Sequence, residues 1–464
     1  MTRKILSLFV ICLVCACLLC GCSSSTTVTT EDGEELSIPK SVSFAAGKMD
    51  TSLTELTLVL EQGEVSQLDY FLNLEKADFS GSECVEEIYN WAKANPQVDV
   101  IYTVTMPDGS VMDTSTRSAD LSQMDGDEVR LWAESLRFLP GLKSIDLGYE
   151  RDSISWDDIG ALQQSCPDVK VKYYFELYGK DFDLQNTQLN LRHVSVYDWL
   201  EGCPQLRNAI DHMPYLTYVD MDSSGVSNEE MVKLRDDYPN IKFVWRVWFG
   251  SEMNYSVRTD TEMILASKPT VGGFIDEVNG ADLKYCTEVK YLDLGHNATM
   301  RDISFVEYMP DLEVAILAMQ KWSDISPLAK CKKLEYLEMQ TTNCTDLSPL
   351  SELENLRHLN VCCIPGLTDI SPLYSLTKLE RLWLGSMNGV PVEQVEEMKR
   401  RAPDCEINTT IYDDPTSGGW RYGYHPEGYI IAAPRYILLR LQFDDYKPSS
   451  FSFYWNDPLY YEYN

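Results

Sequence analysis

The chain has 464 residues, with 39 Lys or Arg against 72 Asp or Glu, so its formal net charge is −33. Hydrophobic residues (44%) and aromatic residues (11%) suffice for a packed core and exclude a wholly disordered chain. The acidic excess disfavours nucleic acid as a partner, because a phosphate backbone requires clustered Lys and Arg, and equally disfavours docking on an anionic lipid surface.

Residues 1–21 are predicted to be a lipoprotein signal peptide. Arg3 and Lys4 precede an apolar run from Ile5 to Leu19, which at 15 residues is too short to span a bilayer as a helix. Its end, Leu19-Cys-Gly-Cys22, resembles the bacterial lipoprotein signal, in which the cysteine after a small residue is lipidated. The resemblance implies that acyl chains such as palmitate on Cys22 anchor the mature protein to the cell membrane, facing outside the cytoplasm. An ordinary signal peptide cut nearby is the alternative.

Residues 22–50 are rich in Ser and Thr and then acidic, which predicts a flexible tether. Beyond Cys22 the chain has nine cysteines with no C-x-x-C or zinc spacing. Their scatter favours buried thiols over a disulfide framework, and an odd number leaves at least one unpaired.

Residues 51–281 are predicted to form enlarged repeat units of a strand, a helix and a second strand. Three segments beginning at Leu74, Leu142 and Leu216 align, and each carries an Asp four residues later. From Asp78 these positions recur after 68, 74 and 73 residues, the last at Asp293. Each segment is followed by a helix-like stretch, a Pro-x-Val/Ile step, and a β-rich run that turns at a glycine (Gly109, Gly179 or Gly250).

Residues 282–411 carry compact repeats and end in a helix–strand unit. The pattern L-x-x-L-x-L recurs with its middle residues at Leu292, Ala315, Leu337, Leu359 and Leu382, which are 22 or 23 residues apart. An Asp-Ile/Leu-Ser-Pro-Leu connection begins at Asp324, Asp346 and Asp369. This is the period of leucine-rich repeats. Because side chains alternate along a strand, stacked copies bury the leucines and display the residues between them.

The stretch from about 286 to 390 resembles the bacterial leucine-rich repeats of the internalin type, whose units carry the same Asp-Ile-Ser-Pro-Leu signature. The predicted fold is therefore an α/β solenoid, with a parallel sheet on its concave face and the enlarged units in its N-terminal half. The resemblance also implies a surface protein that binds another protein.

Residues 412–464 break the repeat and are rich in aromatic residues, among them Trp420, Tyr422 and Tyr424. A solenoid exposes apolar core and an unpaired strand edge at each end, so we expect this segment to be an aromatic C-terminal cap. The alternative is an aromatic platform that binds sugar or peptide.

The candidate ligand-binding residues are the displayed side chains of the compact repeats. They are Tyr291, Asp293, Ile316, Tyr336, Glu338, Gln340, His358, Asn360, Arg381 and Trp383, to which the earlier units add Asp78, Asp146, Tyr218 and Asp220. We expect them to be exposed on the concave face, because they alternate with the inward-facing leucines. Tyr, Trp and Arg are the residue types that dominate binding hot spots, which makes this face a candidate binding surface. The alternative is an ordinary surface, since aromatic residues suit any strand.

No catalytic motif is found, and we predict that the protein is not an enzyme and needs no cofactor or metal. Residues 220–225 match the first half of a calcium loop, but Met231 stands where a bidentate Glu is required. The sequence thus predicts a lipid-anchored cell-surface protein whose repeat face binds an extracellular macromolecule, with protein preferred. The alternative is a carbohydrate-binding lipoprotein that uses the aromatic C-terminal region, with the solenoid as a stalk.

Overall fold

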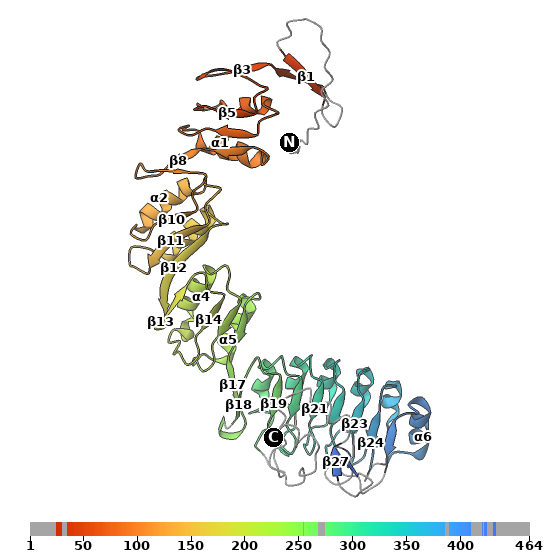
Figure 1. Ribbon diagram of the computed structural model, residues 1–464. Coiled ribbons are helices and arrows are strands. Elements are labelled where there is room, and N and C mark those ends of the chain that lie inside the picture. The colour runs from red at the N-terminus through yellow and green to blue at the C-terminus, as the bar shows by residue number, and fades with distance from the viewer. Residues whose placement is uncertain are drawn as a thin grey trace. The chain divides into compact units, whose positions relative to one another are not determined.

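The computed structural model describes residues 25–29, 35–253, 255–267, 274–385, 389–409, 420, 422–424 and 430–432. The signal peptide with Cys22 therefore lies outside the described residues, as does most of the segment 412–464. The chain, whose helices and strands are labelled in Figure 1, divides into two compact units. The first comprises residues 1–187 and 204–216, and the second comprises residues 188–203 and 217–464.

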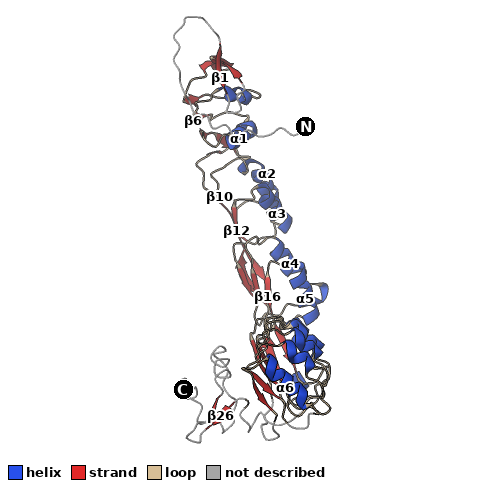
Figure 2. Ribbon diagram, turned by 90° about the vertical axis from the view of Figure 1, so that its right-hand side faces the viewer, coloured by secondary structure: helices blue, strands red, loops and turns tan. Residues whose placement is uncertain are grey.

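Short parallel strands and the helices between them build the first unit. Its sheets have the orders β5-β6-β7 and β10-β11-β12-β13, in which β13 alone runs antiparallel to its neighbour. Ile145 in a strand and Ile88 and Leu162 in helices are fully buried, so the core lies between strands and helices (Figure 2). The strands are β5 (Glu55–Thr57), β6 (Lys76–Asp78), β7 (Asp99–Ile101), β10 (Ser118–Asp120), β11 (Ser144–Tyr149), β12 (Lys170–Leu177) and β13 (Lys180–Asp183). The helices are η1 (Val65–Tyr70), α1 (Val85–Ala94), α2 (Gly126–Leu136), α3 (Trp156–Ser165) and α4 (Pro204–Asp211).

Among the described residues a β-hairpin precedes each parallel sheet, of which the first three have three parallel strands each and the fourth has seven. The hairpins are β3 (Ser41–Phe44) with β4 (Gly47–Asp50), β8 (Thr103–Thr105) with β9 (Val111–Asp113), β12 with β13, and β17 (Arg246–Phe249) with β18 (Tyr255–Arg258). Gly109, Gly179 and Gly250 follow the first strand of their hairpins with φ of 84°, 82° and 80°, a conformation that L side chains resist. The period of about 70 residues is therefore three parallel strands and a hairpin, whereas the sequence predicted a strand, a helix and a second strand.

Part of the segment expected to be a tether is folded. β1 (Ser25–Thr29) pairs with β2 (Glu35–Pro39), and the hairpin of β3 and β4 buries Val42 and Phe44. The cysteines follow the sequence prediction more closely, because the nine described ones are all free thiols and six of them are buried.

The second unit begins with a parallel sheet of β14 (Gln188–Asn190), β15 (Tyr218–Asp220) and β16 (Lys242–Val244). The short η2 (Trp199–Glu201) follows β14, and Ser227 caps α5 (Asn228–Asp237) by accepting a hydrogen bond from the Glu230 amide. An ion cluster joins this sheet to the hairpin of β17 and β18. Asp222, fully buried, accepts two hydrogen bonds from the Arg246 guanidinium at 2.7 and 2.8 Å, and Asp220 pairs with Arg258 at 3.0 Å.

A seven-stranded parallel sheet follows, in chain order from β19 to β25. From β20 to β24 three-residue strands alternate with five-residue 3₁₀ helices, and an α-helix precedes β25. Three of the 3₁₀ helices carry the predicted Pro near their start, where its missing N–H costs nothing. The strands are β19 (Met263–Leu265), β20 (Tyr291–Asp293), β21 (Val314–Ile316), β22 (Tyr336–Glu338), β23 (His358–Asn360), β24 (Arg381–Trp383) and β25 (Glu406–Asn408). The helical segments are η3 (Ser251–Met253), η4 (Ala281–Tyr285), η5 (Ser304–Tyr308), η6 (Ser326–Lys330), η7 (Ser348–Glu352), η8 (Ser371–Ser375) and α6 (Val392–Arg401). A separate antiparallel pair is formed by β26 (Tyr422–Tyr424) and β27 (Ile430–Ala432).

The middle residues of these strands form one buried column, the leucine spine. Leu292, Ala315, Leu337, Leu359 and Leu382 are register partners in successive strands, and each is 0% exposed. The repeat predicted from the sequence is confirmed, and the second unit is a leucine-rich-repeat solenoid.

Polar side chains just after the strands bind backbone carbonyls inside the solenoid. Asn297 Nδ2 donates to Ala266 O at 3.1 Å, and Gln320 Nε2 donates to Leu294 O at 2.6 Å, so each joins two neighbouring turns. In the next turn Thr342 Oγ1 donates within its own turn, to Met339 O at 2.9 Å.

Each of four successive turns holds a non-glycine residue in the left-handed conformation. His296, Met319, Thr341 and Cys363 have φ between 56° and 66°. Their amides donate to carbonyls of the following turn, so the strained residues extend the hydrogen bonding of the sheet beyond the strand ends. Thr341 is the most costly of them, because a β-branched side chain tolerates positive φ least.

We therefore predict that Thr341→Asn raises the free energy of unfolding by about 1 kcal/mol. Asn adopts the left-handed region more readily, the Thr341 side chain is exposed, and the amide hydrogen bond is kept. Urea unfolding measures the change. Thr345→Asn, at an exposed position outside the left-handed region, is the matched control and should change stability by less than about 0.5 kcal/mol. Equal effects of the two substitutions would contradict the strain argument.

Candidate functional site

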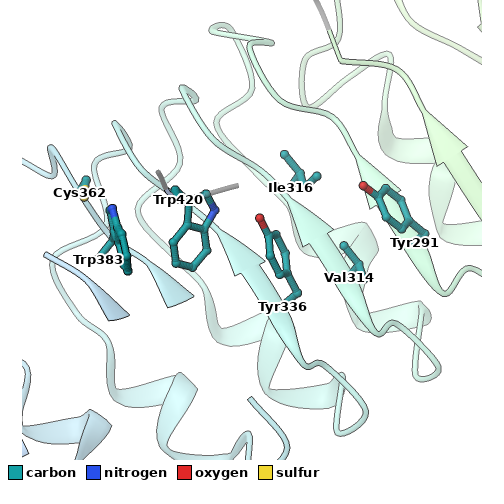
Figure 3. Packing of buried hydrophobic residues seen from close by; sticks show 7 residues of the cluster. All are labelled: Tyr291, Val314, Ile316, Tyr336, Cys362, Trp383 and Trp420. Carbon is teal, nitrogen blue, oxygen red and sulfur yellow. The ribbon is translucent and has the colours of Figure 1, made fainter. Parts of the chain in front are cut away.

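The predicted ligand-binding residues of the compact repeats lie side by side on one face of the sheet from β20 to β24. We call this the outer strand face, since its side chains alternate with the leucine spine. One row is Tyr291, Val314, Tyr336, His358 and Arg381, and the other is Asp293, Ile316, Glu338, Asn360 and Trp383. Figure 3 shows six of the aromatic and apolar members of this region with Trp420 among them.

The exposure predicted for these residues is not found. Ile316, Tyr336 and Trp383, expected to form an exposed apolar patch, are 2%, 1% and 1% exposed. Tyr291, Asp293, Glu338, Gln340, His358 and Asn360 are buried as well, and Arg381 is half-buried. Part of the reason is Trp420, which lies on this face and packs against Tyr336, His358 and Trp383.

Trp420 is held in a pocket made by three successive turns. Its ring centroid lies 5.5 Å from that of Tyr336, 5.9 Å from His358 and 5.3 Å from Trp383. Its indole Nε1 donates to Glu338 Oε1 at 2.9 Å, and its carbonyl oxygen accepts from Arg381 Nη1. We call these five surrounding residues the Trp420 pocket. The indole itself is 0% exposed.

Glu338 is the polar centre of the Trp420 pocket. Its side chain is fully buried, and a buried carboxylate is costly unless donors satisfy it. The Tyr336 hydroxyl and the Trp420 indole N–H both donate to Oε1. Because the indole N–H must meet this one buried oxygen while its ring packs between the neighbouring rings, the indole is held in one orientation.

His358 forms another wall of the pocket. Burial, together with the nearby Arg381 guanidinium, lowers the pKa of His358 from 6.5 to about 4, and Glu380 opposes the shift. The ring is therefore neutral at pH 7. Its Nε2 lies 3.5 Å from Glu380 Oε2, while its Nδ1 is buried without a hydrogen-bond partner.

Further polar atoms of the outer strand face are buried without a hydrogen-bond partner in the described part of the chain. They are Gln340 Oε1, Asn360 Nδ2 and Trp383 Nε1. Each such group costs about 1–3 kcal/mol relative to a satisfied one. Asn360 Nδ2 and Trp383 Nε1 are donors and Gln340 Oε1 is an acceptor, while the role of His358 Nδ1 depends on its tautomer. None of these four atoms makes a hydrogen bond within the described residues.

The candidate residues of the earlier units are engaged locally. Asp78 accepts from the Ser80 amide, which together with the Ser80 hydroxyl lowers the pKa of Asp78, and Asp146 accepts from the Gly148 amide. Tyr218 and Asp220 both contact Arg258. Of the half-matched calcium loop, Asp222 is bound to Arg246, and that guanidinium holds the pKa of Asp222 well below its usual range. Across the described residues, His, Cys, Asp and Glu side chains nowhere gather in threes as metal ligands would.

Comparisons with known proteins identify similar solved structures only. No protein-family model matches the sequence, and no curated protein matches it. An internalin (InlF) of Listeria monocytogenes is 18% identical, with 78% of this chain and 84% of that chain covered and a TM-score of 0.30. Internalin C2 of the same species is 17% identical (56% and 85% covered, TM-score 0.27), and a leucine-rich-repeat protein of Leptospira interrogans is 15% identical (79% and 94% covered, TM-score 0.28). The assignment of the leucine-rich-repeat fold rests on the strand register described above.

The buried histidine predicts an acid-sensitive site. Unfolded His358 takes up a proton near pH 6.5 and the folded residue near pH 4, so between these values acid favours the unfolded chain. Relative to low pH, this difference in proton binding stabilises the folded chain fully above pH 6.5. As the pH falls from 6.5 to 4, the free energy of unfolding decreases by at most about 3 kcal/mol.

His358→Phe keeps a ring that cannot titrate, so the slope of stability between pH 6.5 and 4.5 should be smaller in this variant than in the native chain. Urea unfolding at a series of pH values measures the slope. His193→Asn, at an exposed histidine of the same unit, is the control and should keep the native slope. If His358→Phe shows the same dependence of stability on pH as the native chain, His358 is not the source of the acid sensitivity.

Proposed function

We propose that the chain is a lipid-anchored cell-surface protein that binds another protein through the outer strand face. One observation carries the proposal, namely that this face holds the side chain of Trp420, whose pocket partner Glu338 lies 82 residues away in the sequence. A surface that binds one tryptophan of its own chain has the chemistry to bind polypeptide. Aromatic rings, an Arg and a desolvated acceptor are the features that concentrate binding energy in protein interfaces.

The composition of the outer strand face favours protein over carbohydrate. Its rings are packed edge-on or tilted against Trp420, in an enclosed pocket rather than an open flat platform. In the alternative, the aromatic residues of 412–464 bind sugar. Trp420 belongs to that segment, and both its ring and its N–H are already used by the sheet. The side chains of the other aromatic residues there lie outside the described residues.

A binding protein of this kind is proposed to have no catalytic activity, and its anchor is proposed to be Cys22. Within the described ranges no helix combines the length and apolar character needed to cross a bilayer. The support for the anchor is the lipoprotein-like sequence Leu19-Cys-Gly-Cys22. A single acyl chain binds a membrane only weakly, and stable anchoring takes two signals. We therefore propose that Cys22 carries more than one acyl chain.

We predict that Cys22→Ala abolishes labelling with an alkyne analogue of palmitate and moves the protein from the membrane fraction to the soluble or secreted fraction. Cys20→Ala, two residues earlier, is the control and should still be labelled and remain with the membrane. Membrane retention of Cys22→Ala with undiminished labelling would exclude Cys22 as the anchor.

The binding face is tested by capture of partners from the envelope of the producing cells, using the soluble ectodomain of residues 23–464, without Cys22, as bait. Trp420→Ala should increase capture of a specific partner about fivefold or more, because it vacates the face, whereas Trp420→Ala combined with Trp383→Ala should lose it. Tyr197→Ala, at a residue that is 66% exposed and outside the face, should behave like the native chain. Quantitative mass spectrometry of cross-linked captures measures each result. A partner bound equally by all four proteins would refute the assignment of this face.

A further inference from the structure

The Trp420 pocket has walls at a spacing fixed by the repeat. Tyr336, His358 and Trp383 come from the neighbouring strands β22, β23 and β24, and paired strands lie about 4.8 Å apart. The centroids of Tyr336 and His358 are accordingly 5.6 Å apart. Rings carried at this spacing cover the face and edges of one aromatic guest, and Glu338 lies at the polar end of that guest.

The chemistry of the pocket favours a neutral aromatic donor, and an indole is the group that occupies it. Glu338 Oε1 accepts from both the Tyr336 hydroxyl and the indole N–H, and the indole carries this donor on a large apolar ring. Phenylalanine would leave the buried carboxylate short of that donor. A lysine or arginine guest would meet the Arg381 guanidinium, which lies 4.6 Å from the centroid of Trp383. The pocket is thus suited to a neutral aromatic donor.

The unused polar atoms beside the pocket show that Trp420 does not exhaust what this face can bind. His358 Nδ1 and Trp383 Nε1 belong to rings that contact Trp420, and Asn360 Nδ2 lies in the same row as Glu338 and Trp383. All three side chains are more than nine-tenths buried. A docked peptide carries backbone donors and acceptors that can bind such atoms in addition to placing a side chain in the pocket.

We propose that the Trp420 pocket is a recognition site for a tryptophan side chain of the partner protein, which displaces Trp420. The inference rests on the proposed function and specifies its partner as a protein with an accessible tryptophan. Trp420 acts as an internal competitor, since a tethered group is present at an effective concentration in the millimolar range. A partner displaces it by adding hydrogen bonds to the unused polar atoms.

The test uses the full mature chain and the probe acetyl-Gly-Gly-Trp-Gly-Gly-amide with 5-fluorotryptophan, followed by ¹⁹F NMR. The Trp420→Ala protein should bind the probe, and the native protein should bind it at least tenfold more weakly because its pocket is filled. A probe with 1-methyltryptophan keeps the ring but cannot donate to Glu338, and it should bind Trp420→Ala about tenfold more weakly, as loss of one hydrogen bond to a charged acceptor implies. Glu338→Met in the Trp420→Ala background should show the same loss for the unmodified probe.

Circular dichroism and urea unfolding establish that Trp420→Ala is folded. If that substitution unfolds the protein, Trp420→Val and Trp420→Leu take its place, and absence of probe binding to every folded variant overturns the inference. Equal binding of the two probes, or unchanged binding after Glu338→Met, also overturns it. If the probe does not bind but partner capture still depends on Trp383, only the proposed specificity for tryptophan is rejected. Probe binding as expected, with capture independent of the outer strand face, removes the proposed function and leaves the pocket chemistry standing.

Discussion

The in-register stack of the leucine spine is the constraint on which the second unit depends. Because Leu292, Ala315, Leu337, Leu359 and Leu382 are direct register partners, each strand is fixed relative to the next at every residue. A slip by one residue would turn the leucines outward and the outer row inward, so burial of the spine fixes both faces together. The side chains displayed by the outer strand face are therefore ordered by apolar packing on the opposite side of the sheet, and the Trp420 pocket inherits that order without needing a rigid loop.

Two buried carboxylates in this unit are stabilised in different ways. Asp222 is surrounded by guanidinium groups from Arg246 and Arg258 and by the Ser223 hydroxyl, all within 40 residues of it in the chain. Glu338 has the donors Tyr336 and Trp420, and the second of these comes from the C-terminal segment. Asp222 is thus satisfied by the solenoid alone, which makes it part of the framework. Glu338 also accepts from Trp420, which lies outside the repeats, so this carboxyl group links the framework to a residue that the repeats do not contain.

Sequence reasoning succeeded where a short local pattern determines the structure. The alternation of side chains along a strand was enough to predict the strands from the spacing of the leucines. The missing N–H of proline was enough to place turns at Pro327, Pro349 and Pro372. It missed β5 and β14, because a three-residue strand with one apolar residue, Leu56 or Leu189, carries no detectable period. It placed the outer strand face correctly on one side of the sheet but not its burial, since burial depends on Trp420. That tryptophan follows two glycines in a segment without repeats, and nothing in its neighbourhood indicates which surface it contacts.

Because Trp420 competes for the pocket, the measured affinity of a partner for the outer strand face depends on how much more favourably the partner binds than Trp420 does. A partner that offered only an indole would have to compete with Trp420, which is present at a millimolar effective concentration. A partner that also binds Asn360, His358 and Trp383 gains hydrogen bonds that Trp420 does not make. Discrimination then comes from the difference between two ligands for one pocket rather than from the absolute strength of either. Because Tyr336, Ile316 and Trp383 are buried, the protein does not expose them as one contiguous apolar area, which would promote non-specific association. The same contact thus protects the face and sets the threshold for its use.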